Sequence, residues 1–142
     1  MSRIVASRFH DISCGHRVYG HEGKCRHFHG HNYRVHFTLA PVVGVDVVGR
    51  VLDFSVIKAI LCEWLERTWD HRMLLWTDDP DALELCDLDP DGVVLLPCNP
   101  TAENMAKYLL EEVGPVLLSN LMVELVSVRI EETYKCHAEA SK

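Results

Sequence analysis

The sequence lacks several features that would place the protein outside the ordinary globular class. It has no apolar run long enough to span a membrane. Its first residues interrupt their apolar side chains with Arg3, Arg8 and Asp11, so no signal peptide is expected. It also has no Gly/Ser/Pro-rich linker, low-complexity tract or clear internal repeat. Since 142 residues are one domain's worth of chain, we expect a single domain over residues 1–142, located in the cytoplasm.

Basic charge is scarce as well. Fourteen basic and 21 acidic side chains give a formal net charge of −7, and Lys and Arg form no cluster. Such a chain repels a phosphate backbone, so we expect neither a nucleic-acid partner nor a membrane partner. The six cysteines are spread along the chain and include no CxxC pair, which disfavours a disulfide scaffold, a zinc finger and a thioredoxin-like site.

Histidine, by contrast, is concentrated in the first quarter of the chain, which holds seven of the nine. His29 and His31 begin a segment of alternating apolar residues, which predicts a strand with both imidazoles on one face. His16 could supply a third ligand from the preceding segment. Three neutral imidazoles with an open fourth position form the ligand set of a catalytic zinc site, although nickel, copper and iron also suit histidine. The alternative is that these histidines are exposed polar residues near a loop.

The remaining pattern predicts four strands and two helices. The strands are expected near residues 3–10, 29–39, 51–54 and 121–132, and the helices over 55–68 and about 101–113, the second ended by Pro115. The order β, β, β, α, α, β favours an α+β fold, a four-stranded antiparallel sheet with two helices on one face. Residues 77–97 read as a surface excursion with one short apolar run. Because such a sheet has two free edges, we expect a homo-oligomer.

The run from Cys25 to His31, CRHFHGH, is similar to the CxxxHGH signature of the 6-carboxytetrahydropterin synthase branch of the 6-pyruvoyltetrahydropterin synthase family. Further segments that resemble the family lie in the same order along nearly the whole chain, at residues 14–18, 51–54, 69–71, 99–104 and 129–133. The resemblance implies the T-fold, in which the sheets of several subunits join into a barrel in a homo-oligomer and active sites lie at subunit interfaces. It also implies Zn²⁺ held by His16, His29 and His31.

The implied reaction converts 7,8-dihydroneopterin triphosphate to 6-carboxytetrahydropterin with release of triphosphate and acetaldehyde, in 7-deazaguanine (queuosine) synthesis. Three residues separate Cys25 from His29, whereas the pyruvoyl-forming synthases of the family have more, so the spacing favours the carboxy product. Two alternatives stay open at this point. One is a 6-pyruvoyltetrahydropterin synthase, and the other is a non-catalytic oligomeric module stabilised by zinc.

The resemblance also assigns catalytic roles. Cys25 would be the thiolate base, because a nearby cation and imidazoles favour the ionised thiol. His71 would be a second acid/base whose tautomer is held by Asp70. Cys14 lies two residues before His16 and is interpreted either as a packing residue or as an adventitious fourth ligand.

For substrate binding, Glu132 falls in phase with apolar residues of the last strand, and a carboxylate there can accept two hydrogen bonds from a pterin. Glu131 is the rival for this role, and the family pattern favours Glu132 with Thr133. Thr101 would frame the pterin, whereas Glu103 would cap the second helix. The triphosphate needs cations, for which the sequence offers nearby candidates: Arg17, Lys24, Arg26 and Arg72.

Overall fold

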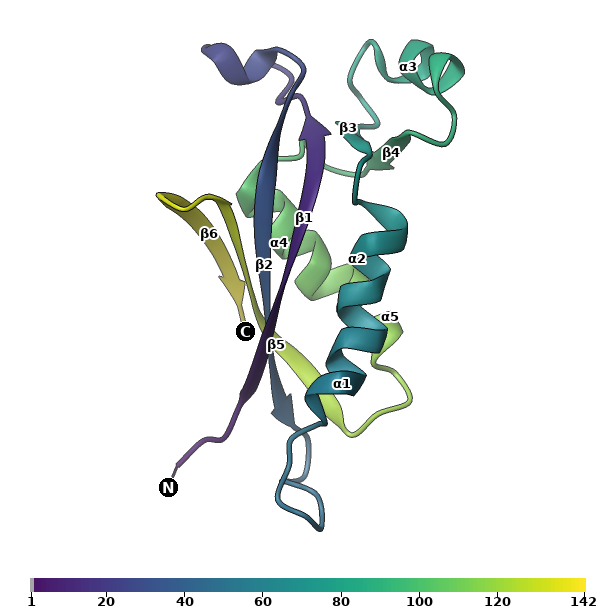
Figure 1. Cartoon of the computed structure of the whole chain (residues 1–142). Helices are drawn as coiled ribbons and strands as arrows, with labels where there is room; N and C mark the ends of the chain where they lie inside the picture. The colour runs from purple at the N-terminus through teal and green to yellow at the C-terminus, as the bar shows by residue number, and fades with distance from the viewer. Residues whose placement is uncertain (1) are drawn as a thin grey trace.

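The computed structural model describes residues 2–142 and contains one six-stranded sheet in the order β4-β3-β1-β2-β5-β6 (Figure 1). The strands are β1 (Ala6–His16), β2 (His29–Pro41), β3 (Met73–Trp76), β4 (Val93–Leu96), β5 (Val123–Thr133) and β6 (Cys136–Ser141). Neighbours among β1, β2, β5 and β6 are antiparallel, whereas β3 runs parallel to both β1 and β4. The α+β class is confirmed.

The sheet has six strands rather than the four expected, and the pairing of β3 is parallel rather than antiparallel. The first strand, expected at residues 3–10, runs from Ala6 to His16 and takes in part of the expected loop.

Residues 51–54 form no strand, because the first helix already begins at Phe54. Asp53 caps this helix, since its carboxylate accepts a hydrogen bond from the Ser55 amide at 2.8 Å. Val51 and Leu52 still pack against the core, which explains their apolar character. Strands β3 and β4 were not predicted as strands. Each is only four residues long, too short for alternation to identify.

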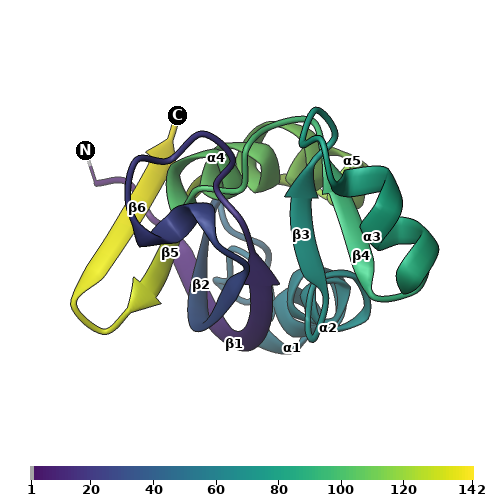
Figure 2. The same ribbon diagram turned by 90° about the horizontal axis from the view of Figure 1, so that it is seen from above.

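Both predicted helices are present and lie on one side of the sheet (Figures 1 and 2). The first helical segment consists of α1 (Phe54–Ile57), the π-turn η2 (Lys58–Cys62) and α2 (Glu63–Thr68). The second consists of α4 (Ala102–Tyr108), the π-turn η3 (Leu109–Val113) and α5 (Gly114–Leu117). Pro115 does not end this segment, because it lies in the first turn of α5, where a missing N–H costs little. A short helix, α3 (Ala82–Leu88), and the single turn η1 (Lys24–Arg26) complete the fold.

The core fills the space between the sheet and these helices. Along β2, Tyr33, Val35, Phe37 and Leu39 are buried, and the residues between them are at least partly exposed, as the alternation predicted. The helices supply the opposing layer, which includes Ile57, Leu61, Leu65, Met105 and Leu109. The other face of the sheet is polar. Within residues 2–142, no helix is both long and apolar enough to cross a membrane.

Trp69 closes one end of this core. Its side chain is fully buried, with its ring centroid 5.6 Å from that of Trp64 and 6.4 Å from that of Tyr108. We expect Trp69→Ala to lower the free energy of unfolding by about 3–5 kcal/mol, because it leaves a large cavity. Urea denaturation measures this change. Leu83→Ala is the control, since Leu83 is 77% exposed and its removal should change stability by less than about 0.5 kcal/mol.

Candidate active site and metal centre

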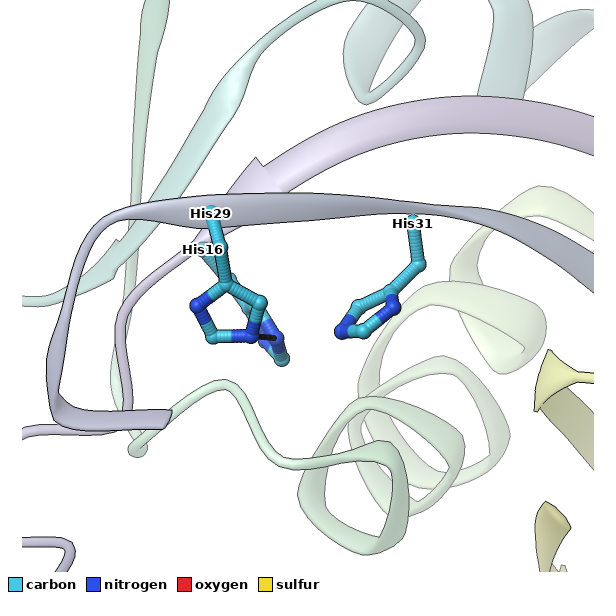
Figure 3. A group of neighbouring side chains, drawn as sticks. All are labelled: His16, His29 and His31. Carbon is cyan, nitrogen blue, oxygen red and sulfur yellow. Dashed lines mark hydrogen bonds between the residues drawn. The ribbon is translucent and has the colours of Figure 1, made fainter. Parts of the chain in front are cut away.

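The register of β1 and β2 sets the positions of three histidines. His16 ends β1 directly opposite His29, the first residue of β2, and His31 follows two residues later on the same face. Figure 3 shows the three imidazoles pointing away from the strands on one side, toward the segment that leads into α4. Their ligand atoms all lie within 4.8 Å of one another. A shift of register by one residue would turn these side chains to the opposite face.

Two of the imidazoles are oriented by backbone carbonyls. His16 donates from Nδ1 to the Pro100 carbonyl at 2.6 Å, and His29 donates from Nδ1 to the His27 carbonyl at 2.6 Å. With Nδ1 protonated, each ring presents Nε2 as a lone pair, and these two Nε2 atoms are 3.0 Å apart. Fixing the tautomer through the second ring nitrogen is typical of metal-ligating histidines.

The third imidazole supplies the strongest sign of a metal site. Nε2 of His31 is buried and has no hydrogen-bond partner within residues 2–142. Burial lowers the pKa of both His16 and His31, an effect that their neighbouring carbonyl or carboxylate groups oppose only in part. For these two rings, burial therefore favours the neutral form that metal binding requires. The donor set and its unpaired nitrogen fit a zinc ion held by three histidines.

Gly30 is needed between the two ligands of β2 because the strands approach closely there. It lies opposite Gly15, and a Cβ on Gly30 would sit 3.0 Å from the Cys14 carbonyl oxygen. A larger residue would push β1 away from β2 and separate His16 from its two partners. The sequence HGH thus combines ligand spacing with a steric requirement.

The two neighbouring glutamates point to opposite faces of the sheet. Oε1 of Glu132 lies 3.6 Å from Nε2 of His31 and 3.8 Å from Nε2 of His16. Glu131 lies on the polar face, where its hydrogen bond with His36 holds the pKa of the carboxyl below its usual range. Only Glu132 therefore presents a carboxylate to the histidine group.

Cys25 lies in the turn η1, on the loop that connects β1 to β2. Its thiol is partly buried, and its backbone carbonyl accepts a hydrogen bond from the Val18 amide at 2.9 Å. Tyr33 was not identified from the sequence as a site residue, yet its hydroxyl lies 3.2 Å from Nδ1 of His16. Burial raises the pKa of this phenol well above its usual value.

Asp70 and His71 lie at the polar face of the sheet. They border a cavity of about 560 Å³ there, together with residues such as Asn32, Arg34 and Thr133. His71 also borders a second cavity, of about 570 Å³, together with His31. The Asp70 carboxylate accepts from the Ser13 amide at 2.8 Å and pairs with Nδ1 of His71 at 2.7 Å. His71 has φ of 60°, and its side chain is 79% exposed. The pair is formed as expected, but the first cavity includes neither Cys25 nor His16.

The start of α4 differs from the expected arrangement. Thr101 caps the helix, since its side-chain oxygen accepts from the Asn104 amide at 3.1 Å. Glu103 makes no such cap and instead borders a small cavity that also includes Glu132 and Cys136. The assignment of the cap to Glu103 was therefore wrong. Thr101 is still close to the histidine group, because His16 binds the preceding carbonyl of Pro100.

Cys14 is a packing residue. It is 5% exposed, and burial raises its pKa to about 12, so its thiol stays protonated at neutral pH. The group that could hold a metal ion contains three histidines and no cysteine.

Comparison with known proteins gives a consistent result. The family model of 6-pyruvoyl tetrahydropterin synthase matches residues 5–142. A 6-carboxy-5,6,7,8-tetrahydropterin synthase from Rickettsia typhi is 33% identical, and the match covers 96% of this chain and 99% of the relative. A probable 6-carboxy-5,6,7,8-tetrahydropterin synthase from Halobacterium salinarum is 37% identical, and the match covers 86% of this chain and 76% of the relative. The solved 6-pyruvoyl tetrahydropterin synthase of Plasmodium falciparum, 20% identical, superposes with a TM-score of 0.72 over 100% of this chain and 99% of that chain.

These matches extend over the sheet, both helical segments and the histidine group. The T-fold expected from the sequence is confirmed. The chain belongs to the 6-pyruvoyl tetrahydropterin synthase family of enzymes.

Proposed function

We propose that the protein is a zinc-dependent 6-carboxy-5,6,7,8-tetrahydropterin synthase. It would convert 7,8-dihydroneopterin triphosphate to 6-carboxytetrahydropterin, release triphosphate and acetaldehyde, and serve 7-deazaguanine (queuosine) synthesis. The observation that carries the proposal is the histidine group with its unpaired buried Nε2, in a chain whose relatives carry this name. The three residues between Cys25 and His29 favour the carboxy product over the pyruvoyl product.

His16, His29 and His31 would hold the zinc ion, and Glu132 and Tyr33 lie beside them. A zinc ion bound there supplies a Lewis acid that acidifies the C–H bond next to the substrate's side-chain oxygens. Cys25, on the adjacent loop, would remove the proton from that carbon as a thiolate. Glu132 would accept hydrogen bonds from the pterin ring, with Thr101 framing it. Thr133 borders the cavity of Asp70 and His71 and would contact the substrate from that side.

Asp70 and His71 would form the second acid/base. Asp70 holds Nδ1 of His71, which leaves the exposed Nε2 free to exchange protons with a substrate. This pair borders the polar face, and the exposed imidazole would face a site that a second copy of the chain completes. A dyad from one subunit would then act on substrate held by the histidines of its neighbour.

A homo-oligomer is supported by the edges of the sheet. In residues 2–142, β1 pairs with β3 only at Gly15 and His16, so the Ala6–Ile12 part of β1 has one unpaired edge, as does β6. Pairing such edges between copies would join the sheets into a barrel with the polar face inward. We also propose a cytoplasmic location, which the six free cysteines support.

Product analysis tests the proposal. Zinc-loaded protein is incubated with 7,8-dihydroneopterin triphosphate, and the products are identified by mass spectrometry. We expect 6-carboxytetrahydropterin, acetaldehyde and triphosphate. A pyruvoyl product would instead assign the protein to the other synthase of the family. No pterin product after verified zinc loading would contradict the enzymatic proposal.

A further inference from the structure

Arg17 follows the proposed ligand His16 and is paired with two acidic residues from a distant part of the chain. Its guanidinium donates to the Asp79 carboxylate through two nitrogens, with Nε at 2.9 Å, and to Oδ2 of Asp81 at 2.7 Å. Asp79 is only 4% exposed and also accepts a hydrogen bond from the Asp81 amide at 2.9 Å. This geometry uses the planar fork of arginine, which lysine cannot reproduce.

These contacts use Nε and Nη2 of Arg17, so the edge of the guanidinium that these two nitrogens form is already bound to carboxylates, and Nη1 is the nitrogen outside these contacts. Asp79 and Asp81 belong to the excursion over residues 77–97, which the proposed chemistry does not otherwise use. A buried carboxylate is retained at little cost only when it is paired and hydrogen-bonded, as Asp79 is. The pair therefore ties the excursion to the end of β1.

The same guanidinium also contacts the far end of the loop that carries Cys25. The Cζ atom of Arg17 lies 4.3 Å from the ring centroid of Phe28, the residue before His29. The loop is closed by the hydrogen bond from the Val18 amide to the Cys25 carbonyl. The side-chain amide of Asn99 anchors the Tyr19 backbone: its Oδ1 accepts from the Tyr19 amide at 3.1 Å, and its Nδ2 donates to the Tyr19 carbonyl at 2.8 Å. Arg17 thus connects both ends of the 17–28 loop to a buried carboxylate outside it.

We propose that Arg17, held by Asp79, is a positioning residue that fixes the 17–28 loop and thereby the Cys25 thiol relative to the histidine group. The inference rests on the proposed function, in which Cys25 is the base. It assigns a role to the excursion, whose residues 79–81 anchor the loop. It also removes Arg17 from the residues that bind triphosphate.

Asp79→Asn tests this inference, because it keeps the shape of the side chain and removes the charge that binds Arg17. We expect kcat to fall about 10- to 100-fold with KM changed less than about 3-fold, since a displacement of about 1 Å costs up to about 100-fold. One zinc per chain should remain bound. Hydrogen exchange of amides 18–28 should accelerate at least about tenfold, because the loop opens locally more often.

Asp46→Asn is the matched control. Asp46 also pairs with an arginine, Arg50, at 2.9 Å, but both side chains are exposed on a loop at the opposite end of the sheet (Figure 1). This variant should leave kcat, KM and exchange in the 18–28 loop unchanged. Equal behaviour of the two variants would overturn the inference.

Arg17→Lys and Phe28→Leu provide a second test should Asp79→Asn fail to fold. Both are expected to lower kcat and loosen the loop while zinc stays bound. A triphosphate contact by Arg17 predicts the opposite pattern, in which Arg17→Lys raises KM and loop exchange stays at the wild-type rate, and that result would contradict the inference. If wild-type protein turns over no pterin, the proposed function fails, and the exchange data alone then decide whether Arg17 and Asp79 fix the loop.

Discussion

Cys25→Ala is expected to lower kcat by about 10²–10⁴-fold, the range that a positioned acid or base contributes, while one zinc ion stays bound per chain. The physical reason is the separation of roles within the site. Cys25 lies on the turn η1 and is not a member of the histidine group, so its removal deletes a proton acceptor without altering the metal ligands. Turnover of 7,8-dihydroneopterin triphosphate and zinc content by elemental analysis measure the two effects.

Cys86→Ala is the control for this substitution, because Cys86 is a partly buried thiol in α3, outside the site. It should retain wild-type kcat. If Cys25→Ala retained full activity, the thiol would not be the base. If Cys25→Ala lost zinc, the thiol would contribute to zinc binding, and the proposal that Cys25 acts only as a base would be wrong.

His29→Ala should abolish stoichiometric zinc binding and turnover together. It removes one of three ligands, so zinc affinity should weaken by more than the roughly 10–100-fold that loss of an outer hydrogen-bond partner costs. The stabilisation by zinc should disappear as well, which at 100 times the dissociation constant is about 2.7 kcal/mol. Competition with a chromophoric chelator and thermal unfolding with and without zinc measure these changes.

His27→Ala is a control from the same segment. The His27 side chain is exposed, and its contact with His29 is made by the backbone carbonyl, which the substitution keeps. This variant should bind zinc like wild-type protein. Equal zinc affinity of His29→Ala and His27→Ala would contradict the proposed metal centre, because His29 would then not be a zinc ligand.

Periodicity predicted the secondary structure well where segments were long. The alternation from His29 to Leu39 gave the correct buried face of β2, and the spacing of apolar residues gave both helical segments. It failed for Val51 and Leu52, because an apolar residue in an irregular loop can pack against a core as well as one in a strand can. Periodicity also failed to predict β3 and β4. These strands are defined by pairing with segments distant in the sequence, and their own residues show no alternation of apolar and polar side chains.

The grouping of the histidines was easier to predict than the partners of charged residues. The spacing of His29 and His31 defines a shared face, whereas the pairing of Arg17 with Asp79 joins residues 62 positions apart. Likewise, the choice between Glu131 and Glu132 depends on the strand end, where the β5–β6 pairing is irregular. Local sequence shows which groups are present, but long-range packing decides which of them are already engaged.

Motifs and alternation are local properties, and they sufficed to predict the family, the α+β class, the shared face of His29 and His31 and the pairing of Asp70 with His71. Tertiary structure decided that His16 meets His29 across two strands, that Nε2 of His31 stays unpaired, and that Arg17 is bound to Asp79. It also placed the dyad at the polar face, in a cavity whose lining includes neither Cys25 nor His16. These outcomes depend on strand register and chain path, which are set by burial of the whole core rather than by neighbouring residues.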